Sequence, residues 1–162
     1  MEVAVKFYGE AEVIDRALSL LDGNNEGDDF LLFVGGEHAQ GILDGAPVLY
    51  WPELWGLRAL LYVWDAKATP AVVNALHNPA WRVREMAARV IIARDLPAAA
   101  ELTELLTDET PRVRIAVARA LGAVGKLDNV EDIRPLLKDP EIEVRRAAQQ
   151  SIDALRKRFP RK

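Results

Sequence analysis

The sequence predicts a mainly α-helical fold, a short α-α superhelix of stacked helix pairs with a small α/β cap at its N-terminus. Three segments share a proline followed within a few positions by Val-Arg, and their valines, Val83, Val113 and Val144, are 30 and then 31 residues apart. An apolar helical pattern recurs in step before each segment, at Val72/Leu76, Leu102/Leu106 and Ile133/Leu137. Two markers with one period indicate stacked supersecondary units.

Residues 1–50 are predicted to form a β-α-β-β cap. Val3, Val5 and Phe7 alternate with less apolar residues, which is typical of a half-buried strand, and residues 10–21 have helical spacing. The apolar run 30–34 suggests a buried strand, and one or two further strands are expected within His38–Leu43 and Pro47–Trp51. A cap is expected because a stack of helix pairs leaves its terminal apolar face bare.

Residues 51–162 are predicted to be the helical repeats: an incomplete unit at 52–68 and full units at 69–94, 95–125 and 126–158. Gly122 and Gly125 are expected to loosen the end of one helix. Pro135 falls in the first turn of its helix if Asp132 is the cap, whereas a start near Asp128 predicts a kink.

The repeated segment is fullest in the run Asp108…Pro111-Arg112-Val113-Arg114…Ala116-Val117-Ala118-Arg119-Ala120-Leu121-Gly122. Over about residues 70–157 the chain resembles the short HEAT-like repeats of the type found in phycobilisome lyases. In that family the Asp and Arg positions form a structural ladder between successive turns and helices. The resemblance implies this role for Asn78, Arg84, Asp108, Arg114, Asp139 and Arg145.

The second helix of each unit carries a polar stripe. Its positions are 82, 85 and 89 and their equivalents one and two repeats later. Second helices line the concave surface of a solenoid, where such proteins bind partners. The candidate partner-binding residues are Arg82, Glu85, Arg89, Arg112, Arg119, Arg146 and Gln150. The same spacing also fits a solvated face.

Aromatic residues gather near the predicted junction of cap and repeats, at Trp51, Trp55, Tyr62, Trp64 and Trp81. Tryptophan and tyrosine are enriched at binding hot spots, but a junction core accounts for the cluster as well. Trp55 and Trp81 are the candidates for exposed aromatic contacts.

The sequence gives little support to catalysis. It has no cysteine, and His38 and His77 are far apart with no ligand cluster of metal-site spacing around them. Gly35-Gly36 lacks the longer pattern of a phosphate loop. We therefore predict a protein that is not an enzyme, with no catalytic, cofactor or metal site.

Charge is unevenly distributed. Residues 1–65 hold 12 acidic and 3 basic residues, and residues 66–162 hold 13 acidic and 18 basic ones. Such an asymmetry steers partners, although a charge-rich solenoid surface gives the same count. The absence of a long apolar run or leader predicts a cytoplasmic protein with no membrane partner.

These observations favour a non-enzymatic scaffold, adaptor or inhibitor that binds another protein on its concave face. A narrower form is an immunity-type protein whose acidic N-terminal part neutralises a basic toxin. The alternative is a nucleic-acid-binding or DNA-repair protein with a basic groove, because HEAT-like repeats hold duplex DNA in some glycosylases. A chromophore-lyase subunit rests on the resemblance alone.

Overall fold

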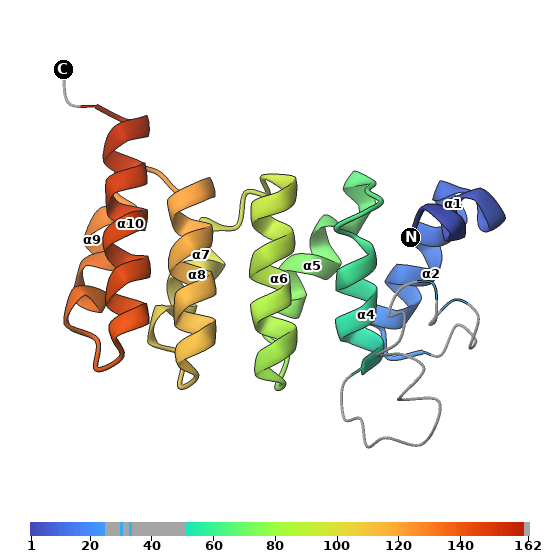
Figure 1. Ribbon diagram of the computed structural model, residues 1–162, viewed down its shortest axis with the longest axis horizontal. Helices are drawn as coiled ribbons and strands as arrows, with labels where there is room; N and C mark the ends of the chain where they lie inside the picture. The colour runs from blue at the N-terminus through green and yellow to red at the C-terminus, as the bar shows by residue number, and fades with distance from the viewer. Residues whose placement is uncertain (25–29, 31–32, 34–50, 161–162) are drawn as a thin grey trace. The chain divides into compact units, whose positions relative to one another are not determined.

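The computed structural model describes residues 1–24, 30, 33 and 51–160 (Figure 1). The chain packs as two compact units, Met1–Ala75 and Leu76–Lys162. The first predicted full repeat, 69–94, is divided between them: its first helix, Thr69–Ala75, belongs to the first unit, and its second, Trp81–Arg94, belongs to the second. The predicted division at residue 50 and the predicted repeat boundaries stay predictions.

The described part of the first unit is helical. Its core is the contact between two helices, α2 and α4, where Val13, Ala17 and Leu57 are fully buried. A Cβ atom on Gly56 would lie 2.6 Å from the carbonyl oxygen of Ala17, so only glycine allows this approach. The elements are α1 (Glu2–Tyr8), α2 (Glu10–Leu21), α4 (Trp51–Ala59), η1 (Ala66–Ala68) and α5 (Thr69–Ala75).

The predicted α/β cap is wrong for the residues that the structure describes, because they contain no strand. The segment expected to begin it is helix α1, in which Ala4 is buried while Val3 and Phe7 are 60% and 74% exposed. Alternation over so few residues cannot separate the two structures, since residues four apart share a helix face. Phe30 and Phe33 also have helical backbone, against the strand predicted at 30–34.

The ranges in which one or two further strands are predicted, 38–43 and 47–51, lie outside the described residues, except that Trp51 begins α4.

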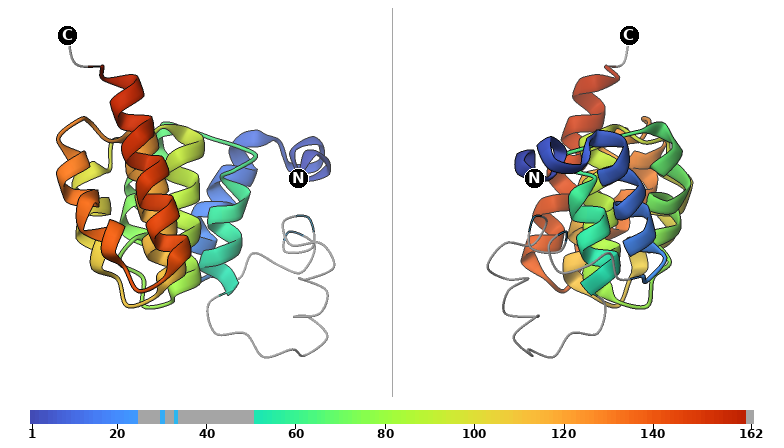
Figure 2. Two further views of the ribbon diagram at one scale, coloured as in Figure 1. Left: turned by 60° about the vertical axis from the view of Figure 1, so that its left-hand side comes forward. Right: turned by 90° about the vertical axis from the view of Figure 1, so that its right-hand side faces the viewer.

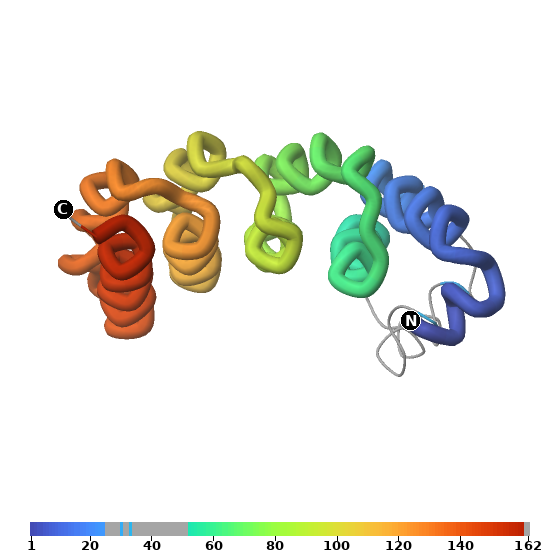
Figure 3. Tube along the Cα trace, turned by 90° about the horizontal axis from the view of Figure 1, so that it is seen from above, coloured from blue at the N-terminus to red at the C-terminus, as the bar shows by residue number. Residues whose placement is uncertain are grey.

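The second unit is a two-layered stack. Helix α8 packs between α6 and α10, and these three long helices form one layer (Figure 1). The shorter elements form the other layer, in which α7 packs on α9 (Figure 3). The elements are α6 (Trp81–Arg94), α7 (Ala99–Glu104), η2 (Leu105–Thr107), α8 (Pro111–Val124), α9 (Asn129–Ile133), η3 (Arg134–Lys138) and α10 (Ile142–Arg158).

The period found in the sequence is the period of the core. Val83, Val113 and Val144 are each fully buried at equivalent places on α6, α8 and α10. Among the helices that the structure describes, α10 is the longest at 17 residues, and its last turns extend beyond α8 (Figure 2).

In the second unit, a proline lies where a helix changes geometry, and a glycine allows two helices to pack closely. Helix α9 begins after Asp128, and the backbone changes from α to 3-10 geometry at Arg134, next to Pro135. Of the two predicted starts, the one near Asp128 is therefore observed, with a change of helix geometry before Pro135. Gly122 does not loosen α8, which continues to Val124; a Cβ there would lie 2.9 Å from Cβ of Ser151, so Gly122 lets α8 approach α10.

Candidate functional site

A groove of about 420 Å³ opens over the layer of α6, α8 and α10. Its lining residues are Glu85, Arg89, Ile92, Arg112, Ile115, Ala116, Arg119 and Glu143. Four of the seven predicted partner-binding residues therefore line one cavity. The other three, Arg82, Arg146 and Gln150, are exposed on the same helices but do not line it.

The helical repeat explains this convergence. Glu85, Arg89 and Ile92 are spaced four and three residues apart, so they share one face of α6. Arg112, Ile115 and Arg119 do the same on α8. The buried valines point into the core, so the polar stripe of each helix lies on the opposite, exposed side, next to the stripe of the neighbouring helix.

One edge of the groove is organised around an ion pair and an aromatic ring. Nη2 of Arg112 donates to Oε1 of Glu85 at 3.2 Å. The guanidinium carbon of Arg112 lies 5.5 Å from the ring centre of Trp81, and that of Arg82 lies 5.2 Å from it. Exposed pairs of either kind contribute at most about 1 kcal/mol each, so their main effect is to orient Arg112.

Two cations in the groove are not engaged. Arg89 and Arg119 are exposed, and within the described residues neither makes an ion pair or a hydrogen bond. On Glu85, the second carboxylate oxygen, Oε2, is buried without a hydrogen-bond partner among the same residues. By contrast, Arg146 donates to Glu143 at 2.7 Å. The groove thus presents free donors and one buried free acceptor.

The six predicted ladder residues lie at the turns that precede α6, α8 and α10 and in the first turns of those helices. Arg84 forms a fork with the next turn: Nε donates to Oδ2 of Asp108 at 2.9 Å, and Nη2 donates to Oδ1 at 3.1 Å. Its Nη1 donates to the carbonyl oxygens of Asn78 and Pro79, both at 2.9 Å. One guanidinium therefore joins two successive turns.

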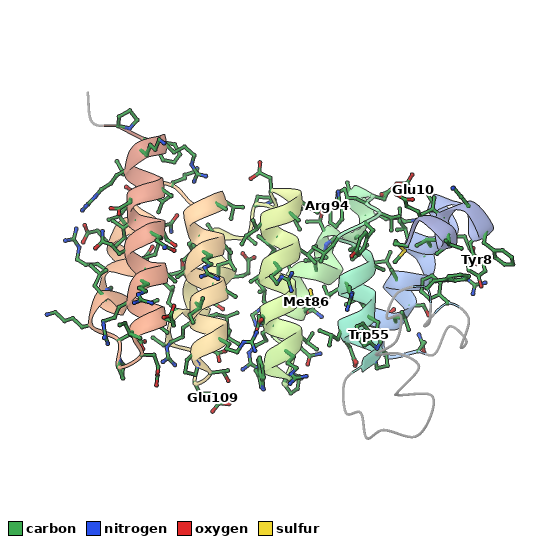
Figure 4. The ribbon with its side chains drawn as sticks, in the orientation of Figure 1. Tyr8, Glu10, Trp55, Met86, Arg94 and Glu109 are labelled. Carbon is green, nitrogen blue, oxygen red and sulfur yellow. The ribbon has the colours of Figure 1, made fainter. Side chains whose placement is uncertain are left out.

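Arg114 repeats this arrangement one unit later. It holds Asp139 at 2.8 and 3.1 Å, and its Nη1 donates to the carbonyl oxygen of Asp108 at 2.7 Å. It also reaches the carbonyl oxygen of Glu109, which lies just before α8 (Figure 4). At the last turn, Arg145 donates to the carbonyl oxygens of Asp139 and Pro140 at 2.6 and 3.0 Å.

The acidic members also organise their own turns. Oδ1 of Asp108 accepts from the backbone N–H of Thr110 at 2.9 Å, and Asn78 makes the equivalent contact with Ala80. Burial alone would raise the pKa of Asp139, but hydrogen bonds from Arg114 and from the backbone N–H of Glu141 outweigh it and lower that pKa. These contacts give the residues a structural role.

A family model for HEAT repeats matches residues 69–153, just over half of the chain. The chain belongs to the HEAT-repeat family. HEAT repeats generally mediate contacts between proteins. Comparison with the curated proteins finds no match.

Of the two predicted aromatic contacts, only the one within the HEAT-repeat stack is accessible. Trp81 is partly exposed beside Arg82 and Arg112. Trp55, on α4 (Figure 4), is 4% exposed, so the prediction that it is a surface contact is wrong. It is therefore part of the core of the first unit.

The stripe predicted from the sequence includes Ile115 of the groove's apolar floor but not Ile92. Ile92 is 38% exposed and lines the groove, whereas its neighbour Ile91 is fully buried. The available signal was position, because Ile92 continues the polar stripe three residues after Arg89.

In the described part of the chain no group of three or more His, Asp or Glu residues could hold a metal ion. None of the helices there has both the length and the apolar character needed to cross a bilayer.

Proposed function

We propose that this HEAT-repeat protein is a non-enzymatic adaptor or inhibitor that binds another protein through the exposed face of α6, α8 and α10, the face predicted to be concave. The observation that carries the proposal is the groove, which combines an apolar floor of Ile92, Ile115 and Ala116 with a charged rim. An apolar centre within a polar rim is the usual anatomy of a protein interface, and arginine is enriched there.

The side chains of the groove suit binding better than catalysis. Arginine is permanently charged and donates hydrogen bonds without exchanging protons at ordinary pH. The remaining polar groups are Glu85, which is held by Arg112, and Glu143, which is paired with Arg146. A general acid–base pair is therefore not what this set of residues supplies.

The test is affinity capture from native lysate with the wild-type protein and with Arg89→Glu/Arg119→Glu. The control is Arg134→Glu, which reverses an exposed charge on η3, in the other layer. We expect the variant to lose a partner that wild type and control both retain, with unchanged circular dichroism. Recovery of the same proteins by all three would show that the groove is not the site.

Nucleic-acid binding is the alternative function. The stripe carries five arginines but also Glu85 and Glu143, giving it a net charge of +3. Duplex DNA would bring its phosphates to both carboxylates, which makes this less favourable than a protein partner. Binding of duplex DNA that falls steeply with salt and is lost in Arg89→Glu/Arg119→Glu would favour the alternative.

The narrower immunity-type proposal depends on the acidic first unit. Glu10, Glu12 and Asp15 are exposed on α2, but Glu12 pairs with Arg16 at 2.8 Å and Asp15 with Lys67 at 2.7 Å. Their field is therefore partly neutralised. If this unit steers a basic toxin, reversing the three charges should slow association with the captured partner, and an unchanged association rate would count against it.

A further inference from the structure

We infer that the groove selects an extended peptide segment with two carboxylates three residues apart and an apolar side chain between them. This inference rests on the proposed function and names the chemistry of the partner at the same site. It depends on the two unengaged arginines, the apolar floor and the unpartnered oxygen of Glu85.

The spacing follows from the repeat. Arg89 and Arg119 occupy equivalent positions on α6 and α8, 30 residues apart, and both line the groove. The axes of packed helices are about 8–10 Å apart, so the two guanidinium groups repeat on that scale. An extended peptide in the polyproline II conformation has three residues per turn and rises about 3.1 Å per residue, so carboxylates at i and i+3 share one face about 9 Å apart and match a segment that crosses the helices.

The residue between the carboxylates meets an apolar surface. The cavity that Arg89 and Arg119 line is also lined by Ile92, Ile115 and Ala116, whose sequence positions fall between those of the two arginines. Ile92 is exposed although its side chain is large and apolar. A leucine or similar side chain at i+1 or i+2 would cover this floor and remove its contact with water.

Glu85 indicates that the occupant also donates hydrogen bonds. Its Oε1 is held by Arg112, while Oε2 is buried and lacks a partner among the described residues. A buried polar atom left in this state is costly, and a peptide backbone N–H would satisfy it.

The test is isothermal titration calorimetry with short acetylated peptides. The probe contains Glu-Leu-Ala-Glu within a Gly/Ser sequence; comparison peptides replace both Glu by Gln, or both by Lys, or place the two Glu side by side. We expect the probe to bind at least about tenfold more tightly than each comparison peptide, which corresponds to about 1.4 kcal/mol.

Protein variants assign this binding to the groove. Arg89→Gln and Arg119→Gln should each weaken the probe about tenfold, the loss expected for one charge-assisted contact. Arg134→Gln removes the same charge from η3 and should leave the affinity unchanged. Arg89→Lys should recover part of the loss because it restores the charge without the planar fork.

Equal binding of the Glu and Gln peptides, tighter binding of the Lys peptide, or equal losses in the groove and control variants would overturn the inference. So would single-stranded DNA binding that depends on both arginines while the probe does not bind. If the charge-reversed variant loses its cellular partner and the probe fails to bind, the protein-binding face stands and only the acidic-peptide inference is wrong.

Discussion

Replacing Arg114 by alanine should destabilise the second unit far more than the loss of an ordinary surface arginine. Arg114 spans two turns: it binds the carboxylate of Asp139 through two nitrogens and the carbonyl oxygen of Asp108 through the third. Both side chains are largely buried, with 13% and 6% of their surface exposed. The substitution would leave the Asp139 carboxylate in that environment with the backbone N–H of Glu141 as its remaining hydrogen bond here.

The expected size follows from these contacts. Removing one partner of a buried ion pair costs about 3–5 kcal/mol, mainly because the other charge is left uncompensated. Since Arg114 keeps some contact with solvent, we expect a loss of about 3 kcal/mol. For a chain of this length that corresponds to a fall in Tm of roughly 6–12 °C.

The assay is urea unfolding followed by circular dichroism, with Tm measured in parallel. Arg134→Ala is the matched control, because Arg134 makes an ion pair with Glu131 in which the side chains are 52% and 71% exposed. Its loss should cost less than about 1 kcal/mol. Arg114→Lys should fall between the two, because lysine restores the charge but not the bidentate geometry.

The reasoning is refuted if Arg114→Ala is no more destabilising than Arg134→Ala. It is also refuted if Arg114→Lys is as stable as wild type, because the fork itself would then contribute nothing.

Three further predictions concern the same unit. In the folded protein the pKa of Asp139 lies below its ordinary value of 3.8. The ionised carboxylate therefore stabilises the fold above pH 3.8, and this stabilisation is lost as the pH falls through the folded-state pKa. In an acid unfolding series, the difference in unfolding free energy between wild type and Asp139→Asn should shrink below pH 3.8. Gly122→Ala places a methyl group 2.9 Å from Cβ of Ser151 and should cost about 1–3 kcal/mol in urea unfolding, despite the better helix propensity of alanine; an unchanged Tm would contradict the close approach. Val113→Ala opens a cavity at a fully buried position and should cost about 2 kcal/mol or more, whereas a smaller loss would mean that the valine row is not the core.

Much of the repeat stack could be predicted because its determinants are local and recurrent. A valine at the same point of each unit predicts a buried row, and Val83, Val113 and Val144 form one. An Asp six residues before an Arg is equally regular, and the pairs Arg84–Asp108 and Arg114–Asp139 follow from it because each turn meets the next unit in the same way.

Prediction failed where no repeat constrained the interpretation. The alternation at Val3–Phe7 is a helix, because five residues of mixed polarity fit either period when no neighbouring unit fixes the pattern. For Trp55 the sequence left both a junction core and a surface contact open. It is buried on α4, a helix that packs on α2, which is distant in sequence.

The sequence by itself determined the helical period, the core row, the ladder positions and the face on which the arginines lie, because each depends on spacing along one helix or on a repeated unit. Only the tertiary structure decided which of those arginines are engaged. Arg112 is held by Glu85 from the preceding repeat and by the ring of Trp81, while Arg89 and Arg119 remain without a partner within the described residues. The physical reason is that pairing depends on distances between side chains of different helices, which spacing along the chain does not contain.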